Sequence, residues 1–271
     1  MQATSLDRAQ RTARRLRGQL VTAVRAAAKL VARAQSRLPP SAVRRKGVGD
    51  FVTLVDECAE RQLRSVLGRL LPEAGFLGEE SRPHGLDRDW VWVVDPIDGT
   101  SNFARGLPQF AVSAALLWRG QPVLACLHCA PEQAIYTATA GGGARRNGSR
   151  LTTPPGRLDD GAMIGCQWHR HRPLRGLLTR LQQHGGRIRT FGSTVVQLAD
   201  VAVGRLDGNV QAPGRIWDIA AAALVVLEAG GCFTDWSGRP VFPLADLDIG
   251  HVATVAAPGN IHRQLLRMAA P

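Results

Sequence analysis

Asp95 and Asp98 directly follow Val91-Trp92-Val93-Val94, an apolar run whose β-branched content predicts a buried strand. Packing does not explain two carboxylates in this place. Carboxylates three residues apart in a loop can converge on one hard cation, and the turn at Pro96 leaves the carbonyl of Ile97 free as a further ligand. A set of oxygen donors favours Mg²⁺ or Mn²⁺ over zinc.

Two other places in the chain offer further carboxylates. Glu79 and Glu80 end the short apolar run that begins at Phe76, and Asp218 opens the apolar run that begins at Trp217. That run predicts a helix, and an acid in the first turn of a helix also stabilises it through the helix dipole. Asp218 is therefore a candidate metal ligand and a candidate helix acid, and the two roles are compatible.

Gly99-Thr100-Ser101 follows Asp98 and is typical of the start of a helix. Backbone N–H groups at a helix start, with little side chain in the way, form an anion site. Metal ligands beside an anion site indicate hydrolysis of a phosphate ester assisted by two or more metal ions.

These motifs, in this order, resemble those of the inositol monophosphatase family, which lies within the fructose-1,6-bisphosphatase-like superfamily of metal-dependent sugar phosphatases. The resemblance spans about residues 46 to 231. Three blocks carry it, Gly78-Glu79-Glu80-Ser81, Asp95-Pro96-Ile97-Asp98-Gly99-Thr100-Ser101-Asn102-Phe103, and Trp217-Asp218-Ile219-Ala220-Ala221-Ala222 running on to Gly231. A chance match to all three blocks in order is very improbable, whereas one block alone would be only suggestive.

The resemblance implies a set of metal ligands. Glu79, Asp95 and the carbonyl of Ile97 would hold a first Mg²⁺ ion, and Asp95, Asp98 and Asp218 would hold a second. Glu79 would also face a third, weaker site. Two to three Mg²⁺ ions are therefore expected, with Mn²⁺ as a substitute.

The resemblance also implies catalytic and phosphate-binding roles. Thr100 and Asp56 would orient and deprotonate the attacking water, and Lys46 would order the waters near the ions. The N–H groups of Gly99 and Thr100 would hold phosphate oxygens. Attack would be in line on phosphorus, with direct transfer to water.

These motifs say less about the substrate than about the metal ions and the reaction. Ser193, Gln211, Arg215 and Asp218 are the substrate-binding residues that the resemblance implies. The family usually has Glu at the position of Gln211, and an amide can donate and accept a hydrogen bond but lacks the charge. Arg215 could meet a second anionic group or face a partner subunit.

Several activities of this fold are therefore alternatives. Histidinol-phosphate phosphatases tend to have an acid after the glycine of Gly192-Ser193-Thr194, and 3′(2′),5′-bisphosphate nucleotidases tend to have Arg at the position of Gln211. Neither pattern fits, so inositol monophosphate or a related sugar or polyol phosphate is favoured, with fructose-1,6-bisphosphatase activity as a further alternative. Some relatives act with RNA or the transcription machinery, which makes a non-enzymatic role the competing class.

The elements that must position these residues alternate along the chain, which predicts an α/β or a layered α+β fold. The resemblance specifies a layered α-β-α-β-α sandwich, with lithium inhibition and a homodimer as further expectations. Residues 1–150 are expected to form an N-terminal α+β domain with most of the ligands, and residues 151–271 a C-terminal α/β domain that supplies Asp218. The expected helices and strands are Ser5–Leu38, Thr53–Leu71, Val91–Val94, Ala111–Trp118, Pro122–Leu127, Ala134–Ala138, Leu174–His184, Val195–Val203, Trp217–Ala229 and His251–Ala257.

The charge of the chain is concentrated at its start. The formal net charge is +12, and residues 1–46 carry 10 Arg and 2 Lys against the single acid Asp7. The helix expected from Ser5, as N-cap, to Leu38 has an apolar stripe that predicts docking on the protein body. Its basic residues can contact nucleic acid, and such binding is expected to be weak and non-specific.

The remaining motifs favour structural roles. Cys126 and Cys129 are three residues apart in an expected strand, so their thiols should lie on opposite faces. Trp90 and Trp92 alternate in another strand and are interpreted as packing residues, and His169-Arg170-His171 as a solvated loop. Five scattered cysteines and the lack of a membrane-spanning apolar run or a leader pattern favour a cytoplasmic protein.

Overall fold

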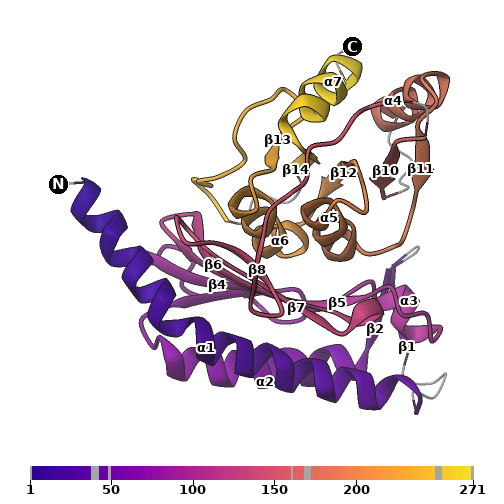
Figure 1. Ribbon diagram of the computed structural model, residues 1–271. Coiled ribbons are helices and arrows are strands. Elements are labelled where there is room, and N and C mark those ends of the chain that lie inside the picture. Colours follow the sequence, from indigo (N-terminus) through magenta and orange to yellow (C-terminus); the bar gives the residue numbers. More distant parts are fainter. Residues whose placement is uncertain are drawn as a thin grey trace.

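The computed structural model describes residues 2–37, 43–47, 50–159, 161–167, 172–247 and 252–269, with the side chains of residues 2–5, 43–47, 50–53 and 172 left aside. Two long helices, α1 (Gln2–Gln35) and α2 (Leu54–Leu70), form the outer layer at one side (Figure 1). Between them in the chain lies a short antiparallel pair, β1 (Val43–Gly47) and β2 (Asp50–Thr53).

The apolar stripe of α1 buries the helix against the protein body, as predicted. The buried positions include Leu16, Leu20, Val24 and Val31, and they share one core with α2 and the first sheet. The helix starts at Gln2, so the prediction of Ser5 as its N-cap was wrong, and Leu38 lies outside the described residues.

The first sheet has seven strands in the order β3-β4-β5-β6-β7-β8-β9. The strands are β3 (Gly75–Gly78), β4 (Trp90–Asp98), β5 (Ala111–Trp118), β6 (Gln121–Cys129), β7 (Ala134–Thr139), β8 (Gly143–Arg146) and β9 (Ser149–Leu151). Only β3 and β4 pair in parallel, and the other neighbours are antiparallel. From β5 to β9 the order follows the chain because short connections join antiparallel neighbours, whereas the longer connection from β4 to β5 contains helix α3 (Thr100–Ala104).

Both faces of this sheet are covered, which explains its continuous apolar runs. Along β4, Trp92 and Val94 face the core shared with α1 and α2, whereas Val91 and Val93 face the core on the other side. The same alternation separates Cys126 from Cys129, which are both buried free thiols in different cores. The predicted opposite placement of these thiols is confirmed.

The second sheet has five strands in the order β11-β10-β12-β14-β13. Its strands are β10 (Met163–Cys166), β11 (Arg187–Arg189), β12 (Gly208–Gly214), β13 (Cys232–Asp235) and β14 (Val252–Ala257). Helices α5 (Thr194–Val203) and α6 (Ile216–Glu228) lie between the two sheets, while α4 (Arg172–Gln183) and α7 (Gly259–Ala269) cover the outer face (Figure 1).

The layers therefore run helix, sheet, helix, sheet, helix, and the expected α-β-α-β-α sandwich is confirmed. The predicted division into residues 1–150 and 151–271 stays a prediction; the chain leaves the first sheet at Leu151 and enters the second at Met163. Within the described residues, no helix combines the length and the apolar character needed to cross a membrane.

Candidate metal and phosphate site

The end of β4 carries the two central carboxylates. The strand does not end at Val94 as predicted, because pairing with β5 continues to Asp98 across an irregularity that begins after Asp95. Within this irregular stretch the N–H of Ile97 donates to Asp95 Oδ1 at 2.9 Å. Asp95 and Asp98 are 1% and 6% exposed. The irregular backbone therefore turns both carboxylates to the same end of the sheet.

Helix α6 brings the third carboxylate to this end of the sheet. Asp218 lies in its first turn, where the N–H of Arg215 donates to Asp218 Oδ2 at 3.2 Å. This contact confirms the role of Asp218 as a helix-start acid. Asp95, Asp98 and Asp218 each offer a carboxylate oxygen within 4.8 Å of the others. Residues more than a hundred positions apart thus form one cluster of oxygen donors.

The pKa values of these buried acids reflect the crowding of negative charge. Burial raises the pKa of Asp95 well above its ordinary value, and the neighbouring carboxylates of Glu79, Asp98, Asp218 and Asp56 raise it further. Burial raises the pKa of Asp98 to about 6, although its hydrogen bonds oppose the rise. Carboxylates held this close stabilise a bound cation, because the cation offsets both their repulsion and their desolvation.

Asp98 is also held by the start of α5. The backbone N–H of Val195 donates to Asp98 Oδ2 at 2.6 Å, and the N–H of Thr194 donates to Oδ1 at 3.3 Å. The hydroxyl of Ser193, the N-cap residue, donates to the same carboxylate. An anion at a helix N-terminus is stabilised by the unpaired N–H groups and the dipole. Asp98 is therefore held in place from the second half of the chain.

A cleft of about 200 Å³ opens over this cluster. Its lining residues are Glu79, Asp95, Ile97, Asp98, Gly99, Thr100, Ser101, Gln167, Gly192 and Asp218. Helix α3 (Thr100–Ala104) starts at the cleft, and its N-cap Gly99 has φ 97°, which favours glycine. The predicted helix start is therefore present, with its N-terminal turn beside the carboxylates.

Two contacts fix the backbone around the cleft. Thr100 Oγ1 donates to the carbonyl of Ile97 at 2.9 Å, which leaves that carbonyl a second lone pair. The amide of Asn102 donates to the carbonyls of Gln109 and Phe191, both at 2.7 Å. Asn102 thereby ties α3 to the loop that carries Gly192, so the two walls of the cleft are held together.

Other residues implicated by the sequence lie around the cleft rather than in its lining. Asp56 on α2 is 1% exposed and contributes to the raised pKa of Asp95. Ser193 is fully buried, and Gln211 on β12 is 3% exposed and donates to Thr194 Oγ1. Arg215 is exposed, with its guanidinium carbon 5.5 Å from the centre of the Trp217 ring.

The remaining motif predictions have mixed outcomes. The side chain of Lys46 and the residues His169 to His171 lie outside what the structure describes. The interpretation of Trp90 and Trp92 as packing residues is confirmed: Trp92 is buried, and Trp90 packs against the same core with part of its side chain exposed.

Two residues near the cleft were missed in the sequence. Glu60 on α2 is 2% exposed, and its Oε2 accepts the N–H of Glu80 at 2.8 Å, so it positions the segment that carries Glu79. Its spacing of four from Asp56, on a helix face otherwise lined by Ala59 and Leu63, was the available signal. Gln167 follows β10 and donates to Thr194 Oγ1 at 3.1 Å. No local pattern distinguishes Gln167 from other exposed amides.

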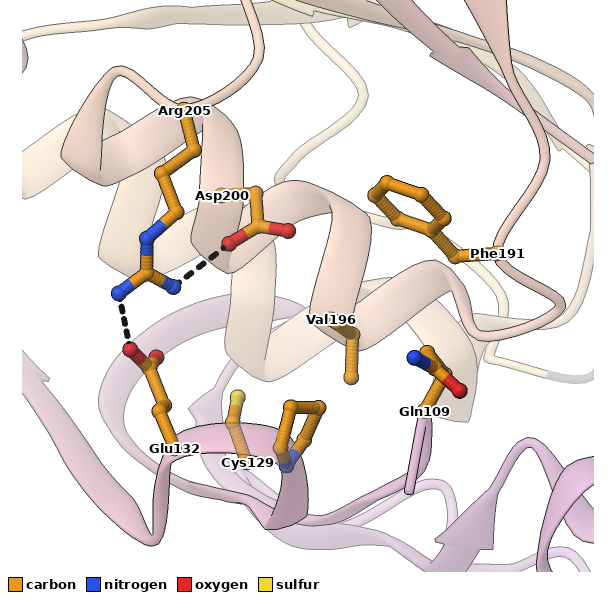
Figure 2. A pocket seen from close by; sticks show the side chains of 8 residues that line it. Gln109, Cys129, Glu132, Phe191, Val196, Asp200 and Arg205 are labelled. Carbon is orange, nitrogen blue, oxygen red and sulfur yellow. Dashed lines mark hydrogen bonds and ion pairs between the residues drawn. The ribbon is translucent and has the colours of Figure 1, made fainter. Parts of the chain in front are cut away.

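A second cleft, of about 160 Å³, lies between the β6–β7 corner and α5 (Figure 2). Its charged groups already pair with one another, since Arg205 contacts both Glu132 and Asp200 (Figure 2). Glu132 also accepts from Arg146 at 2.6 Å. Guanidinium groups therefore neutralise the acids of this cleft, and in the part of the chain that the structure describes the cluster of three acids lies in the first cleft.

Comparisons with known proteins converge on one family. Residues 13–269 match the family described as "Inositol monophosphatase family". "Inositol-1-monophosphatase" of Rhizobium meliloti is 40% identical over 225 residues, which cover 81% of this chain and 85% of that protein. "Nus factor SuhB" of Salmonella typhimurium is 35% identical over 228 residues, which cover 80% and 84%. The crystal structure of the extragenic suppressor protein suhB from Bartonella henselae superposes with a TM-score of 0.82 at 33% identity and covers 92% of this chain and 96% of that one.

Proposed function

The chain belongs to the inositol monophosphatase family, and from this premise we propose that it is an Mg²⁺-dependent phosphomonoesterase that hydrolyses inositol monophosphate or a related sugar or polyol phosphate. The observation that carries the proposal is the convergence of Asp95, Asp98 and Asp218 within 4.8 Å beside the N-terminal turn of α3. This arrangement juxtaposes a cation site and an anion site, which is what a phosphate ester and its metal ions require.

The donor set fits the ions that the family implies. Asp95, Asp98 and Asp218, together with Glu79 and the carbonyl of Ile97, are all hard oxygen donors, and each lines the same cleft. Such donors suit Mg²⁺ and Mn²⁺. When bound, these ions acidify water and stabilise charge on the phosphoryl and leaving oxygens. The raised pKa of Asp95 supports the fit, because a buried cluster of acids must bind either protons or cations near neutral pH.

The residues of the chain then position the reactants. The first N–H groups of α3, at Gly99, Thr100 and Ser101, precede the intrahelical ladder and can donate to phosphate oxygens. The hydroxyl of Thr100 is fixed by its bond to the carbonyl of Ile97. Asp56, buried near Asp95, would accept the hydroxyl proton of Thr100 as Thr100 takes the proton of the attacking water, a relay that requires this hydroxyl to turn from the carbonyl of Ile97 toward Asp56. These groups orient a phosphate for in-line attack without forming a bond to it.

The wall opposite the carboxylates supports a polyol as the leaving group. Gln167 lines the cleft, and its amide donates to Thr194, which also accepts from the buried Gln211. A row of amides and hydroxyls provides donors and acceptors to match alcohol groups. In this arrangement Gln211 acts on substrate through Thr194 and Gln167. Lithium inhibition, a homodimer and a cytoplasmic location are parts of the same proposal.

A second candidate function is a role in transcription. It rests on the name of the Salmonella typhimurium relative, "Nus factor SuhB", which is 35% identical. The acidic cleft favours the enzymatic proposal, because a role in transcription does not require three carboxylates held within 4.8 Å.

The experiment is a panel of phosphate-release assays on the full chain. The substrates are inositol monophosphates, sugar monophosphates, fructose 1,6-bisphosphate, histidinol phosphate and adenosine 3′,5′-bisphosphate, each with Mg²⁺, Mn²⁺ or EDTA. We expect Mg²⁺-dependent release that is fastest with inositol or sugar monophosphates. Equal rates in Mg²⁺ and EDTA, or no release from any ester, would overturn the proposal.

A further inference from the structure

A third cleft, of about 250 Å³, lies at the end of the first sheet opposite to the carboxylates. Its side chains come from α1, from the α2–β3 connection and from the outer ends of β4 and β5: Arg8, Glu73, Asp89, Trp90, Trp118 and Arg119. We call it the tryptophan cleft. Trp90 begins β4 and Asp98 ends it, so the strand separates this cleft from the metal site by roughly 25 Å at about 3.3 Å per residue.

Two indole rings form the aromatic part of the tryptophan cleft. Trp90 and Trp118 are directly paired across β4 and β5, and their ring centres are 6.5 Å apart at an angle of 52°. Both side chains are only partly buried, unlike that of Trp92. Partly exposed aromatic rings in a cleft provide a flat surface on which another planar ring can stack.

Arg119 is fixed beside these rings. It pairs with Asp89 through two hydrogen bonds, of 3.0 Å and 3.2 Å, and its guanidinium carbon lies 5.0 Å from the centre of the Trp118 ring. Its φ of 48° belongs to the two-residue hairpin turn, Arg119-Gly120, that joins β5 to β6, so the turn sets where its side chain starts. The indole rings and a guanidinium plane are the two kinds of surface on which nucleobases stack in proteins.

The basic face of α1 starts at the same cleft. The exposed cations of this helix are Arg8, Arg11, Arg14, Arg15, Arg17, Arg25, Lys29 and Arg33, and all of them except Arg17 project away from the buried stripe. Within the part of the chain that the structure describes, none of them forms an ion pair with a carboxylate. The 34-residue helix is about 50 Å long at 1.5 Å per residue. Its exposed cations continue from Arg8, at the cleft, to Arg33 near the other end of the helix.

We propose that the tryptophan cleft and the adjoining basic face of α1 bind nucleotides, with a base stacked in the cleft and the phosphates against Arg8 and Arg11. Stacking is available to every base, and the carboxylate of the exposed Glu73 can accept from an exocyclic amino group. The same chemistry is presented by a free mononucleotide and by a single-stranded nucleic acid. An acidic protein segment would need the cations but would gain nothing from the indole rings.

The test measures binding of two fluorescent probes by anisotropy, a labelled adenosine mononucleotide and a labelled 12-nucleotide single-stranded RNA of mixed sequence. The full chain is used in EDTA, because without cations the acidic cleft repels phosphate and cannot hold either probe. The variants are Trp118→Leu and Arg8→Glu, and Arg33→Glu is the matched control with the same charge reversal far along the same helix. Arg8 is exposed, so its variant keeps the fold even if Trp118→Leu lowers the melting temperature.

We expect Trp118→Leu to weaken both probes about tenfold or more, since stacking contributes that much per base. Arg8→Glu should weaken both and reduce the slope of log Kd against log salt by about one for each phosphate contact that it removes. Arg33→Glu should leave the affinity for the mononucleotide unchanged. If Arg33→Glu lowers the affinity for the RNA, the strand follows the helix and the natural ligand is a single-stranded nucleic acid. If the RNA binds no more tightly than the mononucleotide, the natural ligand is a free nucleotide.

Two results would overturn the proposal. One is the absence of binding of either probe to the wild-type chain at low salt. The other is RNA binding that does not depend on the indole rings: Trp118→Leu leaves it unchanged, Arg8→Glu and Arg33→Glu weaken it equally, and polyglutamate competes with the RNA. Such a pattern would mean that the basic face binds polyanions in general.

Discussion

Asp98 has two structural roles. It belongs to the cluster of three acids, and it also accepts hydrogen bonds from Ser193, Thr194 and Val195 at the start of α5. The sequence motif predicted the first duty, because the motif places two acids beside a helix start. It could not predict the second, since Ser193 lies 95 residues away and only the fold brings it to Asp98.

Ser193→Ala tests whether Ser193 positions Asp98. The change removes a hydrogen bond that lowers the pKa of Asp98, so that pKa should rise above about 6. A higher pKa leaves the carboxylate more protonated at a given pH, and the acid limb of kcat/KM should therefore move to higher pH, with a several-fold higher Mg²⁺ requirement at pH 6.5. The pH profile and the Mg²⁺ titration are the measurements.

Ser193 also caps α5 by accepting the N–H of Val196 at 3.2 Å, and loss of a cap costs about 1 kcal/mol. A lower melting temperature with an unshifted pH profile would mean that Ser193 only caps the helix.

Gln211→Glu tests how preference among polyols is set. Gln211 donates to Thr194, the hydroxyl that also holds Gln167 at the cleft. A carboxylate cannot donate, so Thr194 would become the donor to it while its oxygen still accepts from the amide of Gln167. Donation to an anion polarises this hydrogen-bonded chain, so Gln167 should bind substrate hydroxyls more strongly. We expect the ratio of kcat/KM for inositol monophosphate over a small aryl phosphate to rise several-fold, with little change in kcat. An unchanged ratio would show that Gln211 has no part in substrate choice.

At the scale of elements, the connection from β4 to α3 decides the geometry of the site. The sequence predicted a strand, two acids and a helix start in that order, and each is present. The prediction placed the acids in a loop, whereas pairing with β5 carries the strand on to Asp98. The motif does not reveal this, because an irregular strand end and a loop have the same local sequence, and only the partner strand distinguishes them.

The burial of α1 and β4 was more predictable, since each depends on its own periodicity. The stripe of α1 and the alternation along β4 repeat with helical and strand periods, and packing against any apolar neighbour satisfies both patterns. The buried Glu60 on α2 was missed because its partner, the N–H of Glu80, comes from a different element.

Gly99→Ala tests the close approach at this connection. A Cβ on Gly99 would lie 2.8 Å from the carbonyl oxygen of Gln109, and φ of 97° strains any residue with a side chain. We expect a loss of stability on the order of 1–3 kcal/mol and a raised KM for phosphate esters, because α3 must shift. Chemical unfolding and steady-state kinetics measure the two effects.

Gly106→Ala is the matched control for this change. Gly106 also has positive φ, 74°, but a Cβ there meets nothing within 4 Å. The Gly106→Ala variant should lose stability through backbone strain, while its KM for phosphate esters stays unchanged. Equal effects of the two substitutions on KM would show that the approach to Gln109 does not shape the phosphate site.

The whole molecule places its site where its layers meet. Asp95 and Asp98 come from the first sheet, and Asp218 comes from a helix that packs between the sheets. The start of α5, which also lies between the sheets, donates hydrogen bonds to Asp98. The layered class followed from the motifs and the alternation of elements. The tryptophan cleft did not, because Arg8, Trp90 and Trp118 are far apart in sequence and only the packing of α1 on the sheet assembles them.

Stability should depend jointly on pH and on Mg²⁺. The pKa values of Asp95 and Asp98 are raised in the folded state, so the metal-free protein loses stability through them as pH rises from about 4 through about 6. Mg²⁺ offsets this loss when it binds the ionised form. We expect Mg²⁺ to raise the melting temperature by about 4–8 °C at pH 7.5, at a concentration near 100 times its Kd, and by far less at pH 5.

The control for this measurement is the difference between Mg²⁺ and EDTA at each pH. His84, His128 and His262 have lowered pKa values, so their contribution to stability rises with pH, in the direction opposite to that of the acids. Their contribution is the same with and without Mg²⁺ and cancels in the difference. A Mg²⁺ shift that is equal at pH 5 and pH 7.5 would argue against binding at these acids.

Whether Asp98 holds a catalytic metal ion is decided by phosphate release from Asp98→Asn at saturating Mg²⁺. The control is Asp87→Asn, because Asp87 is an exposed acid outside the cleft. The Asp98→Asn variant replaces a charged oxygen donor by a neutral amide, and a metal ion contributes several kcal/mol to the transition state. We expect a loss of turnover on the order of a hundredfold or more, with a melting transition that remains cooperative and full activity in Asp87→Asn. Wild-type activity in Asp98→Asn at saturating Mg²⁺ would show that Asp98 is not a ligand of a catalytic metal ion.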